Sequence, residues 1–213
     1  MKVDLINHTE NGDLLVVNAA RCSFDKEHKE FDIEKDTRLI NYLAREKHVL
    51  PFRHPHATLR ISCPIFVHRQ LGKHQVGFSW SEVSRRYITS EPEFFEPFQY
   101  RKSAANVKQG SSKELHEDSG SYRKDMQAHV LSSIALYDKM IEDGVCPEQA
   151  RMVLPQNMYT TSVVTASLLG WHHLYKLRTE EHTQEETREY AQRIGSILSE
   201  CFPVSWTALN SNA

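Results

Sequence analysis

Apolar residues recur at helical spacing in two long segments of the chain. Over residues 122–142 they fall three or four positions apart, which places them on one face of a helix, and Gly144 follows as a residue that commonly ends one. Among charged neighbours, Leu39, Ile40 and Leu43 form a second apolar stripe. These patterns predict amphipathic helices over residues 122–142 and 33–47.

Shorter apolar runs predict strands in the first third of the chain. Residues 3–6 and 14–17 read as strands on either side of Glu10-Asn11-Gly12, a sequence that favours a turn. Residues 58–62 alternate between apolar and polar positions and predict a third strand. Pro64 then stands where a helix including residues 67–71 would begin, because proline is tolerated in a first helical turn.

The C-terminal half is predicted to be mainly helical. A short helix is expected from Pro147 to residue 153, a long apolar one over residues 163–177, and a last one over residues 185–201. Residues 101–120 are rich in Ser, Lys and Glu and are typical of a mobile surface segment. The elements together predict one mixed α and β domain that spans residues 1–213.

The composition is that of a globular protein with one substantial core. Of the 213 residues 39% are apolar and 25% are charged, and the formal net charge is −2. Any grip on anions must therefore come from a local basic pocket, and non-specific nucleic-acid binding is not expected. No run reaches the ~18–20 apolar residues that span a bilayer, and the N-terminus lacks the apolar stretch of a secretory signal.

The cysteines point to a reducing compartment. Cys22, Cys63, Cys146 and Cys201 are widely spaced and form no Cys-x-x-Cys pair, so neither a disulfide framework nor a zinc knuckle is indicated. We expect reduced thiols in a cytoplasmic protein (in the host cytoplasm if the chain is viral) that has no membrane partner.

Two short polar clusters lie close together between apolar runs. They are Arg69-Gln70-Leu71-Gly72-Lys73-His74-Gln75 and Ser81-Glu82-Val83-Ser84-Arg85-Arg86-Tyr87. A folding core does not need this set of cations, amides, hydroxyls and a carboxylate, whereas fixed N–H groups and hydroxyls suit phosphate oxygens. With the guanidinium groups of Arg151 and Arg178, the clusters predict a site for a phosphate and a nucleobase.

Six segments resemble motifs of the flavin-dependent thymidylate synthase family. They occur in the family's order and extend over almost the whole chain, which makes the set far more specific than any one of its members. The segments are Ala19-Ala20-Arg21-Cys22-Ser23-Phe24, Pro51-Phe52-Arg53-His54, Cys63-Pro64-Ile65-Phe66-Val67-His68-Arg69-Gln70, Glu82-Val83-Ser84-Arg85-Arg86-Tyr87, Arg151-Met152-Val153-Leu154-Pro155 and Leu177-Arg178.

The resemblance implies a fold and a reaction. The fold is α/β of the α+β type, an antiparallel sheet flanked by long helices, assembled as a homotetramer with active sites at subunit interfaces. The reaction converts dUMP to dTMP, with 5,10-methylenetetrahydrofolate as carbon donor and FAD, reduced by NADPH, as hydride carrier. No cysteine attacks the pyrimidine ring in this family, and here no cysteine lies inside a polar cluster.

The resemblance also implies roles for individual residues. Arg178 is the expected catalytic group, because a guanidinium against the pyrimidine stays protonated and stabilises negative charge that develops there. The residues expected to bind the nucleotide are Gln70, Glu82, Ser84, Arg85, Arg86, Arg151 and Arg178. Those expected at the flavin are Ser23, His48, Lys73, His74, Gln75, Glu82, Ser167 and His173.

Each of these residues also has a plain structural interpretation. Arg178 could pair with Glu180 or Glu181 at a helix end, and Arg85-Arg86 could form a solvated charged face. Glu82 could simply partner one of those arginines, and a lone histidine such as His173 is more often structural than a ligand.

One motif departs from the family pattern. The family's hallmark is Arg-His-Arg, seven further residues and a serine, whereas this chain has Lys73-His74-Gln75, eight residues and Ser84. Lys73 keeps a charge without the planar fork, and Gln75 is neutral. Leu50 stands where the family has a threonine at the flavin, and Ser167 where it has an asparagine.

Three other hypotheses are consistent with the residues. The chain could be a nucleotide-binding module that has lost flavin, or a related flavoenzyme that modifies a pyrimidine nucleotide in another way. His54, His56, His68 and His74 could form a metal site, since imidazole is a common zinc ligand. Their spacing argues against that site, and no metal is expected.

Overall fold

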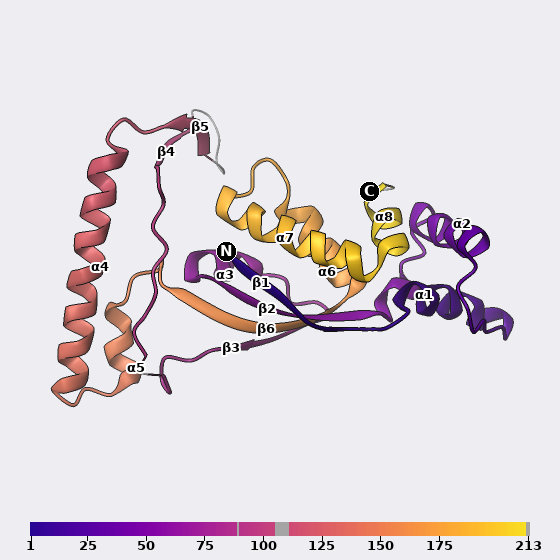
Figure 1. The fold of residues 1–213 in the computed structure, drawn as a ribbon, viewed down its shortest axis with the longest axis horizontal. Helices are drawn as coiled ribbons and strands as arrows, with labels where there is room; N and C mark the ends of the chain where they lie inside the picture. Colours follow the sequence, from indigo (N-terminus) through magenta and orange to yellow (C-terminus); the bar gives the residue numbers. More distant parts are fainter. Residues whose placement is uncertain (89, 105–110, 212–213) are drawn as a thin grey trace.

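A four-stranded antiparallel sheet lies at the centre of the molecule. The computed structural model describes residues 1–88, 90–104 and 111–211. The sheet has the order β1 (Lys2–His8), β2 (His56–Pro64), β6 (Tyr159–Ser167), β3 (Phe78–Glu82). Every neighbouring pair is antiparallel, and β6 pairs with β2 on one side and with β3 on the other. The curved sheet runs across the middle of Figure 1.

Alternation along the two central strands separates a core face from an open face. Leu59 and Ile61 on β2 and Val164 and Ala166 on β6 are at most 1% exposed. On the other face Arg60 is exposed, and half-buried hydroxyls pair across the strands: Thr58 with Thr165 at 2.9 Å and Ser62 with Thr161 at 2.6 Å. The period of two along a strand therefore directs the apolar side chains toward the helices.

Helices cover the core face. Above the sheet in Figure 1 lie α6 (Leu168–Arg178), α7 (Glu185–Cys201) and α8 (Pro203–Ser211), while α3 (Ile65–Leu71) follows β2 directly. Gly195 permits the close approach of α7 to α6, since a Cβ there would lie 2.4 Å from the Tyr175 ring. At the other end, α1 (Gly12–Arg21) and α2 (Ile33–Arg45) pack against one another, and α2 also packs against α8.

An arm extends from the opposite end of the sheet. Its longest element is α4 (Ser119–Glu142), which stands away from the sheet at the left of Figure 1. Beside it lie the hairpin β4 (Arg101–Ser103) with β5 (Ser111–Leu115), the short helix α5 (Pro147–Ala150) and the 3-10 turn η3 (Arg151–Val153). Within the described residues, no helix combines the length and apolar character needed to cross a bilayer.

Most of the expected elements are present, with two errors of type. The segment 14–17 lies in helix α1 and is not a strand, because the packing of Val16 and Val17, both 0% exposed, decides the type of a short apolar run. The segment 163–177 is not one helix. Its first five residues belong to the central strand β6, and the helix begins at Leu168, where the Ser167 side chain accepts a hydrogen bond from the Gly170 N–H.

The segment 101–120, predicted to be a mobile surface segment, forms β4, β5 and the start of α4 in its described parts. Residues 105–110 lie outside the described residues. Arg101 connects the hairpin to α7 through Glu185, at 2.9 Å, and Glu186, at 2.8 Å. These contacts join the arm to the body of the protein.

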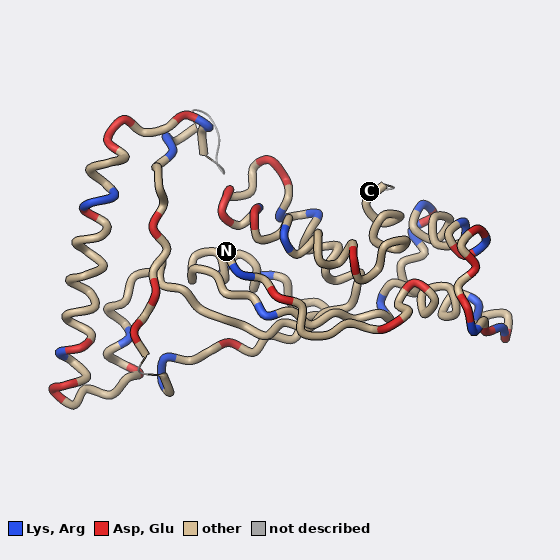
Figure 2. The backbone as a smooth tube through the Cα atoms, viewed as in Figure 1, with Lys and Arg blue, Asp and Glu red and all other residues tan. Residues whose placement is uncertain are grey.

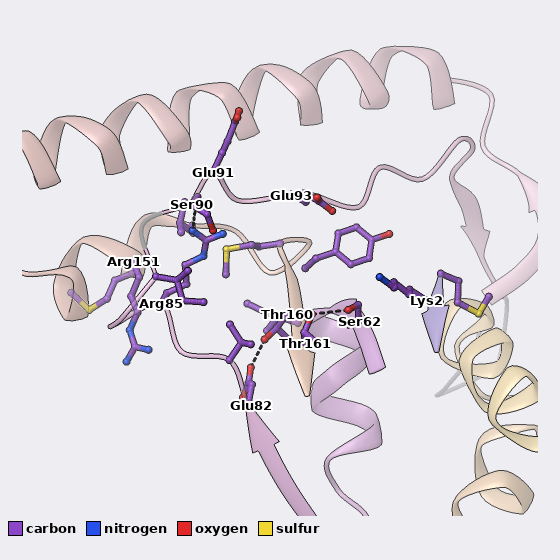
Figure 3. Close-up of a pocket in the computed structure, with 18 residues that line it drawn as sticks. Lys2, Ser62, Glu82, Arg85, Ser90, Glu91, Glu93, Arg151, Thr160 and Thr161 are labelled. Atoms are coloured by element: carbon purple, nitrogen blue, oxygen red, sulfur yellow. Dashed lines mark hydrogen bonds between the residues drawn. The ribbon is translucent and has the colours of Figure 1, made fainter. Parts of the chain in front are cut away.

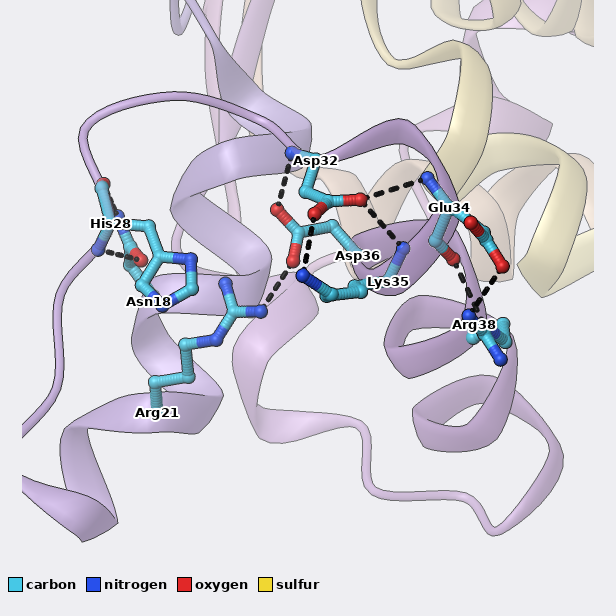
Figure 4. A network of polar contacts seen from close by, with 8 residues as sticks. All are labelled: Asn18, Arg21, His28, Asp32, Glu34, Lys35, Asp36 and Arg38. Carbon is cyan, nitrogen blue, oxygen red and sulfur yellow. Dashed lines mark hydrogen bonds and ion pairs between the residues drawn. The ribbon is translucent and has the colours of Figure 1, made fainter.

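A buried ion pair joins α1 to α2 (Figure 4). Arg21 donates to the carboxylate of Asp36, whose side chain is 0% exposed, and the same carboxylate accepts the Asp32 N–H at 2.9 Å. Asp32 in turn caps α2 through the N–H groups of Glu34 and Lys35. One carboxylate thus fixes both the end of α1 and the start of α2, and with them the loop that carries Ser23.

We expect Asp36→Asn to lower the free energy of unfolding by about 3–5 kcal/mol, because it leaves the Arg21 charge buried without a counter-charge. The matched control is Glu34→Gln, whose partner Arg38 is 70% exposed; this exposed pair should contribute less than about 1 kcal/mol. Urea unfolding monitored by circular dichroism measures both. Equal costs for the two variants would show that Arg21 does not depend on Asp36.

Candidate active site

A cavity of about 720 Å³ lies where the arm meets the end of the sheet (Figure 3). Its walls come from the ends of β2, β3 and β6, from the segment after β3, and from η3. Glu82, Arg85 and Arg151 line it together with Lys2. Acidic and basic residues are interspersed along the chain (Figure 2), so the cations here are a local feature that the net charge does not reveal.

Glu82 is held from the sheet and from α3. Its Oε1 accepts a hydrogen bond from the Thr160 hydroxyl at 2.8 Å, and its Oε2 lies 4.0 Å from His68 Nδ1. The simple interpretation of Glu82 as a partner of Arg85 or Arg86 is not what the structure shows. Arg85 donates to the Ser90 carbonyl, and Arg86 contacts Glu148 at 3.5 Å.

The remaining nucleotide-site candidates of this region gather around α5. Arg86 Nε donates to the Ser84 hydroxyl at 3.3 Å, and Arg151 Nε donates to the Glu148 carbonyl at 3.4 Å. The Glu148 side chain and backbone therefore hold two arginines from different segments. Arg86 remains 44% exposed, so it lies at the surface rather than among the residues that line the cavity.

Arg178 lies in a second cavity, of about 360 Å³, together with Gln70 and Gln184. Its Nη2 donates to the Gln70 carbonyl at 2.8 Å, and its Nε donates to His74 Nε2 at 3.1 Å. In the part of the chain that the structure describes, no carboxylate lies within ion-pair distance of Arg178, so Glu180 and Glu181 do not neutralise it. The side chain is fixed by neutral partners.

The contact with Arg178 determines the state of His74. Because Nε2 accepts from Arg178, the ring must be neutral with its proton on Nδ1. Burial, and next the Arg178 charge, lower the pKa of His74 to about 4. Burial also lowers the pKa of Arg178, whose guanidinium nevertheless remains protonated at neutral pH.

Two of the flavin-site candidates, Ser167 and His173, line a third cavity, of about 300 Å³. Arg53 and His56 lie in the same lining, from the 3-10 turn η2 (Leu50–Arg53) and the start of β2. Burial, followed by the charge of Arg53, lowers the pKa of His173. The other candidates lie outside this cavity. Lys73 and Gln75 are exposed, Ser23 is exposed after α1, and His48 packs edge-on against Tyr42.

Comparison with known proteins places the chain in a family. A family profile described as Thymidylate synthase complementing protein (Thy1) matches residues 4–204. The flavin-dependent thymidylate synthase of Thermus thermophilus is 35% identical over 201 residues, which cover 94% of this chain and 72% of that protein. The chain belongs to this family. The Thermotoga neapolitana flavin-dependent thymidylate synthase is 36% identical over 206 residues, covering 96% of this chain and 88% of that one.

Solved structures share the fold of this family member. The UMP/dUMP methylase PolB from Streptomyces cacaoi, crystallised with 5-Br dUMP, matches with a TM-score of 0.88 and 26% identity. The match covers 99% of this chain and 94% of PolB, and a second PolB structure with 5-Br UMP also has a TM-score of 0.88, at 25% identity. The family resemblance and the antiparallel sheet flanked by helices are thereby confirmed.

Sequence reasoning missed several groups around the sites of this thymidylate synthase homologue. Lys2, Thr160 and Tyr159 line the first cavity, and Arg53 lines the third. Thr160 and Tyr159 could have been found from alternation along β6, had that segment been identified as a strand. Lys2 carries no local signal, since only the pairing of β1 with β2 places it beside Ser62.

The histidines considered for a metal site have other neighbours. His68 contacts Ser162, His74 contacts Arg178, and His56 Nδ1 lies 2.8 Å from the His54 carbonyl. Among the described residues, no three His, Cys, Asp or Glu side chains are grouped so that they could hold a metal ion.

The depressed pKa of His74 predicts a pH dependence of stability. Between pH of about 4 and 6.5 the folded chain binds fewer protons at His74 than the unfolded chain. The contribution of neutral His74 to the free energy of unfolding is therefore fully present above pH 6.5 and is lost as the pH falls toward 4. His74→Gln retains an acceptor for Arg178 and removes the titration. We expect the variant to lose less unfolding free energy than the wild type between pH 7 and pH 5 in urea titrations. Between pH 7 and 8 the two proteins should change in parallel, and parallel loss below pH 7 as well would contradict the assignment.

Proposed function

We propose that this chain methylates dUMP to dTMP, with 5,10-methylenetetrahydrofolate giving the carbon. FAD reduced by NADPH supplies the hydride when bound. The observation that carries the proposal is Arg178, a partly buried guanidinium held by a carbonyl and a neutral imidazole instead of a carboxylate. A structural arginine is usually paired with a carboxylate, whereas a group that must meet developing negative charge keeps its own charge available.

In this proposal Arg178 lies against the pyrimidine edge that gains negative charge as C5 becomes nucleophilic. The bonds to Gln70 and His74 fix the guanidinium before substrate arrives, so little reorganisation is needed. Arg85 and Arg151 supply cations for the phosphate of the nucleotide, and Glu82 supplies a fixed acceptor at the mouth of the same cavity.

The cysteines support a route without a thiol nucleophile. Burial, and next the charge of Glu82, raise the pKa of Cys63 to about 12, and burial also raises the pKa of Cys201. A thiol with a raised pKa carries little of the reactive thiolate at neutral pH. Cys22 and Cys146 are exposed, and neither lines any of the three cavities in the described structure.

The third cavity suits a flavin. Arg53 offers a cation for a pyrophosphate, Ser167 and His173 offer polar contacts, and Val76 on its rim is 88% exposed. Nearby, Leu50 is 64% exposed on η2. Exposed apolar side chains beside a few polar groups fit a ring system that is itself apolar with a polar edge. These residues favour retained flavin over a nucleotide-binding module that has lost it.

We further propose that each complete site takes residues from more than one chain of a homotetramer. In one chain, Arg178 lies in one cavity, and Glu82 with Arg151 lies in another. Large apolar side chains beside both regions are exposed, including Leu177 next to Arg178 and Tyr87 and Met152 near Glu82 and Arg151. Such exposure is typical of surfaces that another subunit covers.

A second candidate is methylation of UMP. PolB, which has the same fold, is described as a UMP/dUMP methylase and was crystallised with 5-Br UMP as well as 5-Br dUMP. Product formation from dUMP and from UMP, compared under identical conditions, decides between the two substrates.

The reaction is tested anaerobically with NADPH, the folate and dUMP, by following flavin bleaching and dTMP formation. Arg178→Ala should lower kcat about 10²–10³-fold, as loss of a preorganised charge does, and leave the unfolding midpoint nearly unchanged. The control is Arg188→Ala on α7, a half-buried arginine outside the three cavities that donates to the Glu181 carbonyl at 3.0 Å. Turnover within twofold of the wild type in Arg178→Ala would refute the proposed role, and a colourless purified wild type would indicate that flavin is not retained.

The shared site predicts complementation between two inactive variants. Arg178→Ala and Glu82→Ala chains, each inactive alone, should regain activity when they are co-expressed with different tags and purified through both tags. Random mixing gives sites with both native residues in roughly a quarter of cases, so roughly a quarter of wild-type activity is expected. Mixed assemblies as inactive as either parent would show that Arg178 and Glu82 act within one chain.

A further inference from the structure

His68 is a polar residue of α3 that contacts the core face of the sheet, and it is not among the residues expected at either site. It projects from α3, and its side chain is 14% exposed. Its Nε2 lies 2.8 Å from the hydroxyl of Ser162, which is 1% exposed, and its ring meets Trp80 edge-on at 5.5 Å. These contacts on two sides fix the ring plane.

The surroundings of the ring determine which nitrogen carries the proton. Nδ1 faces the Glu82 carboxylate, whose Oε2 is 4.0 Å away, and a lone pair there would be repelled by that charge. The proton is therefore favoured on Nδ1, and Nε2 accepts a hydrogen bond from Ser162. The buried serine hydroxyl thereby gains an acceptor, and Glu82 gains a neighbouring N–H dipole, with Nδ1 4.0 Å from Oε2.

Glu82 is consequently held from both sides. Thr160, which lies on the same face of β6 as Ser162, donates to Oε1 of Glu82, and His68 lies on the side of Oε2. The pairing of β3 with β6 sets Glu82 opposite Ser162, so the serine that orients His68 and the carboxylate that His68 faces occupy one rung of the sheet. A carboxylate whose two oxygens are both directed in this way presents its remaining lone pairs to the cavity in a fixed orientation.

We propose that His68 is a positioning residue that fixes the Glu82 carboxylate for nucleotide binding. The inference rests on the proposed function and adds to it a residue that does not touch the substrate. His68 acts through Glu82, with Ser162 setting its tautomer.

The same contacts connect the two cavities of one chain, the one lined by Glu82 and the one lined by Arg178. Trp80, which packs against His68, donates from its indole N–H to the His74 carbonyl at 3.0 Å. The His74 ring accepts from Arg178. A continuous set of contacts therefore runs from Glu82 through His68, Trp80 and His74 to Arg178. His68 is next to Glu82 in this set, so a substitution of His68 acts first on Glu82.

Two substitutions separate the two nitrogens of His68. His68→Asn retains an N–H donor near the position of Nδ1, toward Glu82, whereas His68→Gln retains an amide near the position of Nε2, toward Ser162. If the Glu82 contact matters, His68→Gln should weaken dUMP binding by about tenfold in calorimetry, and His68→Asn by less than about threefold. A merely structural role would affect both variants alike. The matched control is His116→Asn, because His116 also lies near a carboxylate, 3.9 Å from Asp118, but in the arm.

A double-mutant cycle shows whether His68 works through Glu82. In a Glu82→Gln background, His68→Gln should change the dUMP dissociation constant by less than about twofold, because the carboxylate that it orients is absent. A tenfold effect in both backgrounds, or equal effects of His68→Asn and His68→Gln, would overturn the inference.

A measurement without ligand separates this inference from the proposed function. In ¹⁵N-histidine-labelled full-length protein, assigned by comparison with His68→Asn, the ring of His68 should carry its proton on Nδ1 and shift toward Nε2 in Glu82→Gln. A proton on Nε2 of His68 in the wild-type protein would overturn the inference, regardless of the protein's activity. Failure of the wild type to bind dUMP, with the proton found on Nδ1, counts against the proposed function and leaves the contact with Glu82 established.

Discussion

The pairing of β6 with β2 on one side and β3 on the other is the constraint on which the whole site depends. It places Glu82 opposite Ser162 and beside Thr160 on the same face, over α3 and His68. The same strand runs directly into α6, which carries Arg178 to the carbonyl of Gln70 at the end of α3. A slip of one residue would turn Thr160 and Ser162 to the open face, because strand side chains alternate with a period of two. The register of β6 with β2 and β3 thus determines where polar groups from distant segments of the chain meet.

The electrostatic design differs between the arginines that stabilise the fold and the one proposed for chemistry. Arg21 is neutralised by Asp36, and Arg101 by Glu185 and Glu186. These pairs offset the cost of desolvating a guanidinium and join separate elements. Arg178 is also partly desolvated, yet its partners are a carbonyl and a neutral ring. Its charge is therefore positioned without being neutralised, which is the condition for stabilising an anion that forms only during reaction.

Sequence patterns predicted the elements whose packing follows from local spacing. The stripes of α2 and α4 were found because three- and four-residue intervals are specific to helices. The segments 14–17 and 163–167 were assigned to the wrong type because a short apolar run fits a strand and a helix equally well. For β6 the deciding factor is burial between two strands, which depends on residues about 100 positions earlier in the chain. The cavity around Glu82 was predicted only in part for the same reason, since Lys2 and Thr160 reach it through strand pairing.

The altered hallmark Lys73-His74-Gln75 divides into an inner and an outer part. His74 faces inward, where it accepts from Arg178 and is partly buried. Lys73 and Gln75 are exposed, and Gln75 donates to the backbone carbonyl of Gly72 within its own loop. Of the side-chain contacts described for these three residues, that of His74 reaches Arg178, so the outer two side chains can change without displacing it. The residue kept from the family pattern, His74, is thus the one that accepts a hydrogen bond from Arg178 at the end of α6. The substitutions therefore fall on the exposed side of the loop and not in this chain's own core.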